Sequence, residues 1–124
     1  MSRRGEAAEK FAERRRREDE APRLKDLVPD LKACRIEIAE RRSNVTSADV
    51  NHTRHVVVAS ASAMLVVPCS DPSCQGWGHD IGPSLLRGYR DRRAEIRGED
   101  ACDGYVGGDR CGRVLTFAAF AQYA

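Results

Sequence analysis

The cysteines constrain the fold of this chain more than any other feature of its sequence. Four of the five form two pairs within turn-rich segments, Cys69 with Cys74 in "CSDPSC" and Cys102 with Cys111 in "CDGYVGGDRC". Four residues lie inside the first pair, eight lie inside the second, and 27 residues separate the pairs. The sequence therefore offers two short thiol-bearing loops that are far apart along the chain.

Both loops adjoin segments that have the residue pattern of strands. The segment "RHVVVASASAMLVVP", residues 54–68, is rich in β-branched residues and predicts a long strand that ends just before Cys69, either straight or bent at its small "ASAS" centre. The segment "RVLTFAAFAQYA", residues 113–124, predicts a terminal strand that follows Cys111. If the two strands are antiparallel neighbours, the loops meet at one end of the sheet and four thiolates can converge on one ion.

Zinc suits such a convergence, because structural zinc sites use four tetrahedral ligands with Zn–S distances of about 2.3 Å. We therefore predict a structural Zn²⁺ bound by Cys69, Cys74, Cys102 and Cys111. Binding such an ion contributes roughly 10–16 kcal/mol of apparent free energy to folding. That contribution matters in a chain of 124 residues of which only 6% are aromatic.

The turn at Cys111 and Gly112, followed by "RVL", resembles the second zinc knuckle of zinc-ribbon and treble-clef proteins, in which a cysteine–glycine turn leads into a strand. The resemblance covers the two cysteine loops and their strands, and it implies a structural metal site. Disulfides within each loop, and thiols that bind no metal, are the alternatives. Cys34 lies beside Ile36 and Ile38 in sequence and is predicted to be a small buried residue.

Two further residues near the first loop are candidates for the site. His79 can replace a cysteine as a ligand or orient one from outside the metal, although a role at the start of the following helix, beside Asp80, is the favoured interpretation. Trp77 lies between two glycines and is predicted to contact a partner, with a lid over the metal end as the alternative.

The remaining segments predict a simple order of elements. Residues 1–21 are expected to be a charged arm, either a marginal helix or disordered, and residues 22–124 a single domain. Residues 21–33 suggest a short helix, and the alternation in "ACRIEIAERRS" favours a strand, with a helix through Ile38 as the rival. Residues 43–53 are predicted to be a polar loop. "AEIRGEDAC" predicts a short strand.

The main helix is expected to begin at Asp80, because an aspartate is a good N-cap and an apolar stripe follows it. With these elements the chain is predicted to be an α+β protein with a small antiparallel sheet and one main helix packed on it. The stripe consists of Ile81, Leu85, Leu86 and Tyr89, and Gly88 is expected to let the helix approach the sheet.

Charge and motifs limit the function. The net charge is +2, no phosphate loop or nucleophile–base pair is evident, and no apolar run of membrane-spanning length occurs. Because no apolar signal segment is evident either, we expect a cytoplasmic protein with reduced thiols. We predict a non-enzymatic, zinc-stabilised interaction module that binds a protein partner or a second copy of itself, with no small-molecule substrate.

Two alternatives stay open. The first is a nucleic-acid-binding zinc module that uses the basic residues on and after the helix, which are Arg87, Arg90, Arg92, Arg93 and Arg97. The second is a thiol redox or metal-sensing protein that uses the paired cysteines. Arginine greatly outnumbers lysine in the chain, which a bias in overall composition also explains.

Overall fold

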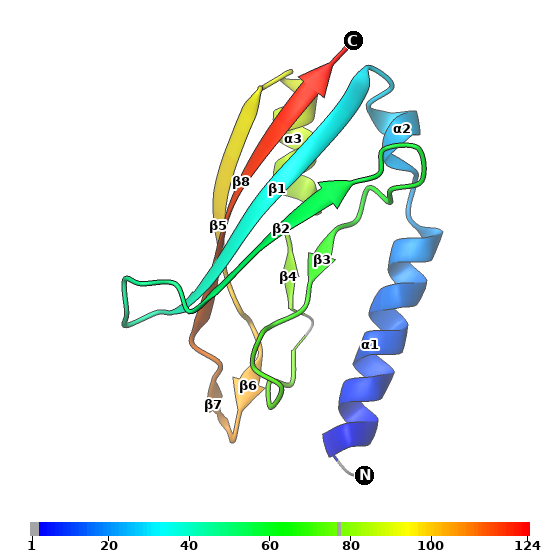
Figure 1. The fold of residues 1–124 in the computed structure, drawn as a ribbon. Coiled ribbons are helices and arrows are strands. Elements are labelled where there is room, and N and C mark those ends of the chain that lie inside the picture. The colour runs from blue at the N-terminus through cyan, green and yellow to red at the C-terminus, as the bar shows by residue number, and fades with distance from the viewer. Residues whose placement is uncertain (1–2, 77) are drawn as a thin grey trace.

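The computed structural model describes residues 3–76 and 78–124, with side chains described from residue 9 onward except at position 11. Its centre is a four-stranded antiparallel sheet in the order β2-β1-β8-β5 (Figure 1). The strands are β1 (Leu31–Arg42), β2 (Val50–Val56), β5 (Glu95–Ala101) and β8 (Arg113–Tyr123). The α+β class predicted from the sequence is therefore confirmed.

The two central strands, β1 and β8, pair along almost their whole length, from Leu31 opposite Tyr123 to Arg42 opposite Arg113. Side chains alternate between the two faces of a strand, so one face of each strand supplies the core. Ile36 on β1 and Leu115 on β8 are both 0% exposed. The predicted strands at residues 34–43 and 113–124 are thus confirmed, and the rival helix through Ile38 is wrong.

Helix α3 (Gly82–Arg90) covers the inner face of this sheet (Figure 1). Three residues of the predicted stripe, Ile81, Leu85 and Tyr89, are buried, whereas Leu86 is only half-buried. A Cβ at Gly88 would lie 2.5 Å from Cδ1 of Ile96 on β5, so the glycine permits the expected close approach. The helix begins later than predicted, because Ile81 and not Asp80 is its N-cap residue. Asp80 Oδ1 instead accepts a hydrogen bond from the backbone N–H of Gly82 at 3.0 Å.

Helix α1 (Arg3–Glu20) gives the charged N-terminal arm a regular structure. Three backbone carbonyls near its end accept hydrogen bonds from the Arg23 guanidinium, which caps the helix. The helix also contacts the rest of the chain, because Glu18 accepts a hydrogen bond from the backbone N–H of Val66 and Lys10 donates one to the carbonyl of Gln75. The short helix α2 (Leu24–Leu27) follows and buries Leu24.

The long strand expected over residues 54–68 is wrong. Strand β2 ends at Val56, and the chain turns at once, with the N–H groups of Ser60 and Ala61 donating to the carbonyl of Val57. The small residues after the turn contact the α2 segment, where Leu24 N–H donates to Ala61 O. After this turn the chain forms an isolated bridge between Ser62 and Arg23 and then the short strand β3 (Val66–Val67), which pairs with β4 (His79–Asp80).

The predicted loop over residues 43–53 is shorter than expected, because β2 begins at Val50. β5 confirms the strand predicted from "AEIRGEDAC". Between β5 and β8, a small hairpin of β6 (Tyr105–Val106) and β7 (Asp109–Arg110) carries the second cysteine loop to one end of the molecule (Figure 1).

Candidate metal centre

The four paired cysteines converge. Their Sγ atoms all lie within 4.8 Å of one another, with 3.5 Å between Cys69 and Cys111 and 3.6 Å between Cys74 and Cys102. A tetrahedron with metal–sulfur bonds of about 2.3 Å has edges of about 3.8 Å. The sulfurs therefore have the spacing of a four-thiolate metal site, and this cluster can hold a metal ion.

The loops meet by a route that differs from the one expected. β3, which precedes Cys69, pairs with β4 and not with β8. Backbone hydrogen bonds between the two loops bring the sulfurs together instead: Gln75 N–H donates to Tyr105 O at 2.9 Å. Within the second loop, Cys111 N–H donates to Gly104 O at 2.9 Å. The prediction that both loops meet was right, although the strand pairing behind it was wrong.

Local turn chemistry shapes the first loop, "CSDPSC". Asp71 accepts hydrogen bonds from two N–H groups, through its carboxylate from Ser73 at 2.8 Å and through its backbone carbonyl from Cys74 at 3.0 Å. These bonds close a tight turn that directs Cys74 toward the second loop. Gly104 lies opposite, where any Cβ would collide with Cys74 Sγ, so only glycine fits beside that sulfur.

Burial controls the ionisation of the sulfurs. Cys102 is only 4% exposed, and the other three cysteines of the cluster are half-buried. Desolvation raises the pKa of Cys74 to about 12 and also raises the pKa of Cys69 and of Cys102. Without a metal these thiols therefore keep their protons at neutral pH, and a binding cation must displace them.

All five cysteines are free. The closest sulfur pairs join different loops, so the alternative of a disulfide within each loop does not match the arrangement. Cys34 lies away from the cluster as expected: it is 4% exposed and accepts a hydrogen bond from the Tyr89 hydroxyl at 3.1 Å. Comparison with protein-family models, with curated proteins and with solved structures finds no match. The zinc-knuckle resemblance of the Cys111–Gly112 turn therefore stays a prediction.

A buried polar network, which the sequence analysis missed, adjoins the cluster. His79 is 0% exposed and Glu40 is 2% exposed. His79 Nδ1 lies 2.8 Å from Asp100 Oδ2, and its Nε2 lies 3.3 Å from Glu40 Oε1. Arg113 lies beside this network, with Nε 4.0 Å from Glu40 Oε1 and the rest of its guanidinium paired with Asp49 at 2.8 and 2.5 Å.

His79 therefore has a different position from the favoured one, because its ring binds two carboxylates and the contact at the helix start belongs to Asp80 alone. One oxygen of Glu40, one nitrogen of His79 and the sulfur of Cys69 lie within 4.8 Å of one another. A signal for the network was present in the sequence, since Glu40 occupies the inward position of the alternation that buries Ile36 and Ile38.

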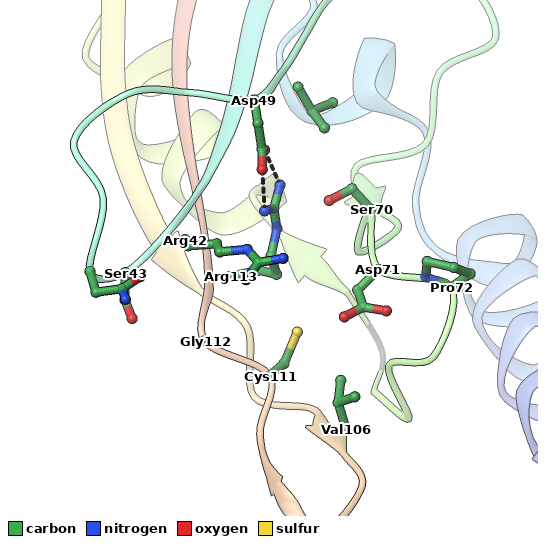
Figure 2. Close-up of a pocket in the computed structure, with 12 residues that line it drawn as sticks. Arg42, Ser43, Asp49, Ser70, Asp71, Pro72, Val106, Cys111, Gly112 and Arg113 are labelled. Atoms are coloured by element: carbon green, nitrogen blue, oxygen red, sulfur yellow. Dashed lines mark hydrogen bonds and ion pairs between the residues drawn. The ribbon is translucent and has the colours of Figure 1, made fainter.

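A pocket of about 800 Å³ opens beside the cluster (Figure 2). Cys111 and Arg113 line it from the start of β8, while Ser70 and Asp71 line it from the first cysteine loop. The remaining wall comes from the β1–β2 turn, including Arg42. Because both arginines and acidic side chains line the pocket, it shows no single charge preference.

The arginines predicted to bind a partner have different environments. Arg87, Arg90 and Arg93 are exposed, and within residues 3–76 and 78–124 none of the three forms an ion pair with a carboxylate. Their neighbours are paired, Arg92 with Asp30 and Arg97 with Glu95. Trp77, the other predicted partner contact, lies outside the described residues. None of the described helices combines the length and the apolar character needed to cross a membrane.

Proposed function

We propose that this protein is a non-catalytic interaction module whose fold a structural zinc ion stabilises. The observation that carries the proposal is the convergence of four sulfurs from two distant loops to within 4.8 Å. Four cysteine ligands leave zinc no open coordination position, which is the arrangement of structural sites, whereas a catalytic zinc keeps a position for water. Zinc is favoured among metals because it takes tetrahedral thiolate ligands.

The position of the cluster supports a stabilising role. The first loop follows β3 and the second connects β5 with β8. One ion would therefore tie the two-stranded sheet of β3 and β4 to the main sheet. Few buried apolar side chains lie in this end of the molecule, whose hairpin β6–β7 is largely exposed. An ion here replaces the hydrophobic contacts that the end of the molecule lacks.

The outer face of the main sheet is the surface we propose for a protein partner or a second copy. Helix α3 packs on the inner face, while a shallow hollow of about 450 Å³ lies on the outer face. Small side chains (Ala39, Thr116, Ala118) line it together with polar and charged ones (Glu37, Asn51, His52, Thr53, Arg97). Ion pairs flank that hollow, such as Arg41 with Glu99 at 3.7 Å. Small residues framed by charged ones suit a flat contact with another protein.

Elemental analysis of the purified full-length chain tests the metal site, combined with thermal melting before and after chelation. We expect one or more zinc ions per chain. We also expect a loss of cooperative melting when the metal is removed, because no ion then holds the two cysteine loops together. Cys74→Ser should lose the metal, whereas Cys34→Ser, which changes a cysteine outside the cluster, should keep it. A native protein that contains no metal would refute the proposal.

Size-exclusion chromatography with light scattering tests self-association, and Ala118→Glu places a charge in the centre of the proposed surface. A dimer that becomes a monomer in this variant would assign the outer face to a second copy. Asp91→Lys, a charge change at the exposed end of α3, serves as the control that should leave the oligomeric state unchanged.

Nucleic-acid binding is the second candidate function. It is favoured by the three arginines on and after α3 that form no ion pair with a carboxylate of the described residues. Their guanidinium groups are therefore available for phosphate oxygens. Phosphate binding releases counterions, so affinity should fall steeply as salt increases.

A titration with mixed-sequence RNA and duplex DNA at low and moderate salt distinguishes the candidates. The triple variant Arg87→Ala, Arg90→Ala, Arg93→Ala should weaken binding and flatten its salt dependence, while Arg35→Ala on the outer face of the sheet should not. If the unmodified protein binds neither nucleic acid at low salt, this second function is excluded.

A further inference from the structure

The group of Glu40, His79 and Cys69 is not explained by a single four-cysteine site. Glu40 and His79 are among the most deeply buried side chains of the protein, at 2% and 0% exposure. Taking a charged group out of water is costly, so buried charges are paired with short hydrogen bonds or coordinate metal ions. The contacts of these residues show which of the two applies.

Glu40 lacks a short partner among the described residues. Its Oε1 lies 3.3 Å from His79 Nε2, 3.4 Å from Ser70 N and 4.0 Å from Arg113 Nε. Charge-assisted hydrogen bonds to a carboxylate are about 2.7–2.9 Å long. Arg113 Nε itself is buried without a hydrogen-bond partner in the described part of the chain. The carboxylate is therefore buried with its strongest interaction missing.

Both ring nitrogens of His79 face carboxylate oxygens. A neutral imidazole can donate a hydrogen bond to only one of these carboxylates, because only one of its nitrogens carries a proton. The short 2.8 Å contact assigns that proton to Nδ1, which donates to Asp100. The lone pair of Nε2 then faces Glu40 Oε1 across 3.3 Å. A cation between them removes the repulsion, either a proton or a metal ion.

The sulfur of Cys69 favours the metal ion. A proton needs only Glu40 and His79, whereas a metal ion needs a third ligand, and Cys69 Sγ lies within 4.8 Å of both other ligand atoms. Tetrahedral zinc with bonds of about 2.0–2.1 Å to nitrogen and oxygen has N–O edges of about 3.3–3.4 Å, which matches the Nε2–Oε1 separation. Histidine ligands also commonly donate their other N–H to a carboxylate, as His79 does to Asp100.

We propose that the protein binds a second zinc ion through Glu40, His79 Nε2 and Cys69, with the Cys69 thiolate bridging this ion and the one held by the four cysteines. The inference rests on the proposed function, because Cys69 belongs to both sites. It is also consistent with charge. Four thiolates around one dication carry a net charge of −2, and the carboxylates of Glu40 and Asp100 lie nearby. A second dication offsets that excess.

Stepwise titration of the metal-free, reduced full-length chain with Co²⁺ tests the inference, because the visible absorption of Co²⁺ depends on its ligands. We expect saturation at two ions per chain. The first ion should give the intense sulfur-to-metal bands of a four-thiolate site, and the second should add bands at shorter wavelength from nitrogen and oxygen ligands. Saturation at one ion with only four-thiolate bands would overturn this inference and leave the proposed function standing. No binding at all would overturn both.

Variants assign the ligands. Glu40→Gln keeps the size of the side chain and should lower the saturation from two ions to one without changing the sulfur bands of the first. Glu99→Gln, an exposed carboxylate on β5, is the matched control and should still bind two. Should Glu40→Gln fail to fold, Asp100→Asn tests the same site, since loss of such an orienting carboxylate weakens metal binding by about 10- to 100-fold. Two tightly bound ions in both variants would exclude the assignment.

Discussion

Gly104 offers a sharp test of the sulfur cluster, because its position beside Cys74 makes a single methyl group a probe of the site. A Cβ added at Gly104 would lie less than 3.0 Å from Cys74 Sγ and 3.1 Å from both Cα and N of Gly76, whereas ordinary contacts measure 3.4–4 Å. Cys74 Sγ must therefore move by at least 0.4 Å. Metal–ligand distances tolerate only about 0.2 Å.

We expect Gly104→Ala to destabilise the zinc-bound protein by about 1–3 kcal/mol, the usual cost of overpacking. At about 1.4 kcal/mol per tenfold change, that cost corresponds to zinc binding weakened by roughly 5- to 140-fold. Without zinc, neither the variant nor the parent should melt cooperatively, so the difference between them should appear only in the zinc-bound forms. Competition with a chromophoric chelator measures the affinity, and thermal melting with and without chelator measures the stability.

Gly108→Ala is the matched control in the same loop. Gly108 has a φ of +90° and an added Cβ would meet nothing within 4 Å. The substitution therefore costs about 1–2 kcal/mol of backbone strain without touching a sulfur. Its zinc affinity should equal that of the parent within about twofold, a small fraction of the loss expected of Gly104→Ala. If Gly104→Ala binds zinc as tightly as Gly108→Ala does, the convergence of Cys74 with the second loop is refuted.

Three further predictions concern stability. Cys102→Ser should abolish zinc binding and unfold the C-terminal half, whereas Cys34→Ser should cost about 0.5–3 kcal/mol; equal losses in melting temperature would place Cys34 in the site. Hydrogen bonds from Arg113 lower the pKa of Asp49, so this pair stabilises the fold above about pH 4 and its contribution disappears as the pH falls. Asp49→Asn should therefore be less stable than the parent to urea at pH 7, and this difference should narrow as the pH falls below about 4. A difference that stays the same over this pH range would contradict the prediction. Gly88→Ala should cost about 1–3 kcal/mol by pressing on the isoleucine of β5, with zinc affinity unchanged.

Local patterns predicted the elements that pack against the core. The alternation around Ile36 and the apolar stripe that ends at Tyr89 show which face of the strand and of the helix is buried. The spacing of apolar residues in a single sequence contains this information. The meeting of the two cysteine loops was also predictable, since two pairs of cysteines in turn-rich loops are a pattern typical of a shared metal site.

Two features were beyond local patterns. The β-branched run of residues 54–68 has strong strand propensity, but contacts with the α2 segment at Ala61 hold it in a turn, and tertiary contacts of this kind override propensity. The network of His79 depends on two residues far away in sequence, Glu40 on β1 and Asp100 on β5. A single amino-acid sequence does not show which of its distant residues come into contact.

The pairing of β1 with β8 determines when the protein can acquire its structure during synthesis. Leu31 opposes Tyr123, so a strand made early by the ribosome stays unpaired on this side until β8 has been made. Cys111 lies just before β8 and is the last of the four clustered cysteines to be made. The apolar side of β1 and the first three of these cysteines are therefore exposed together in the nascent chain until residues 111–123 follow.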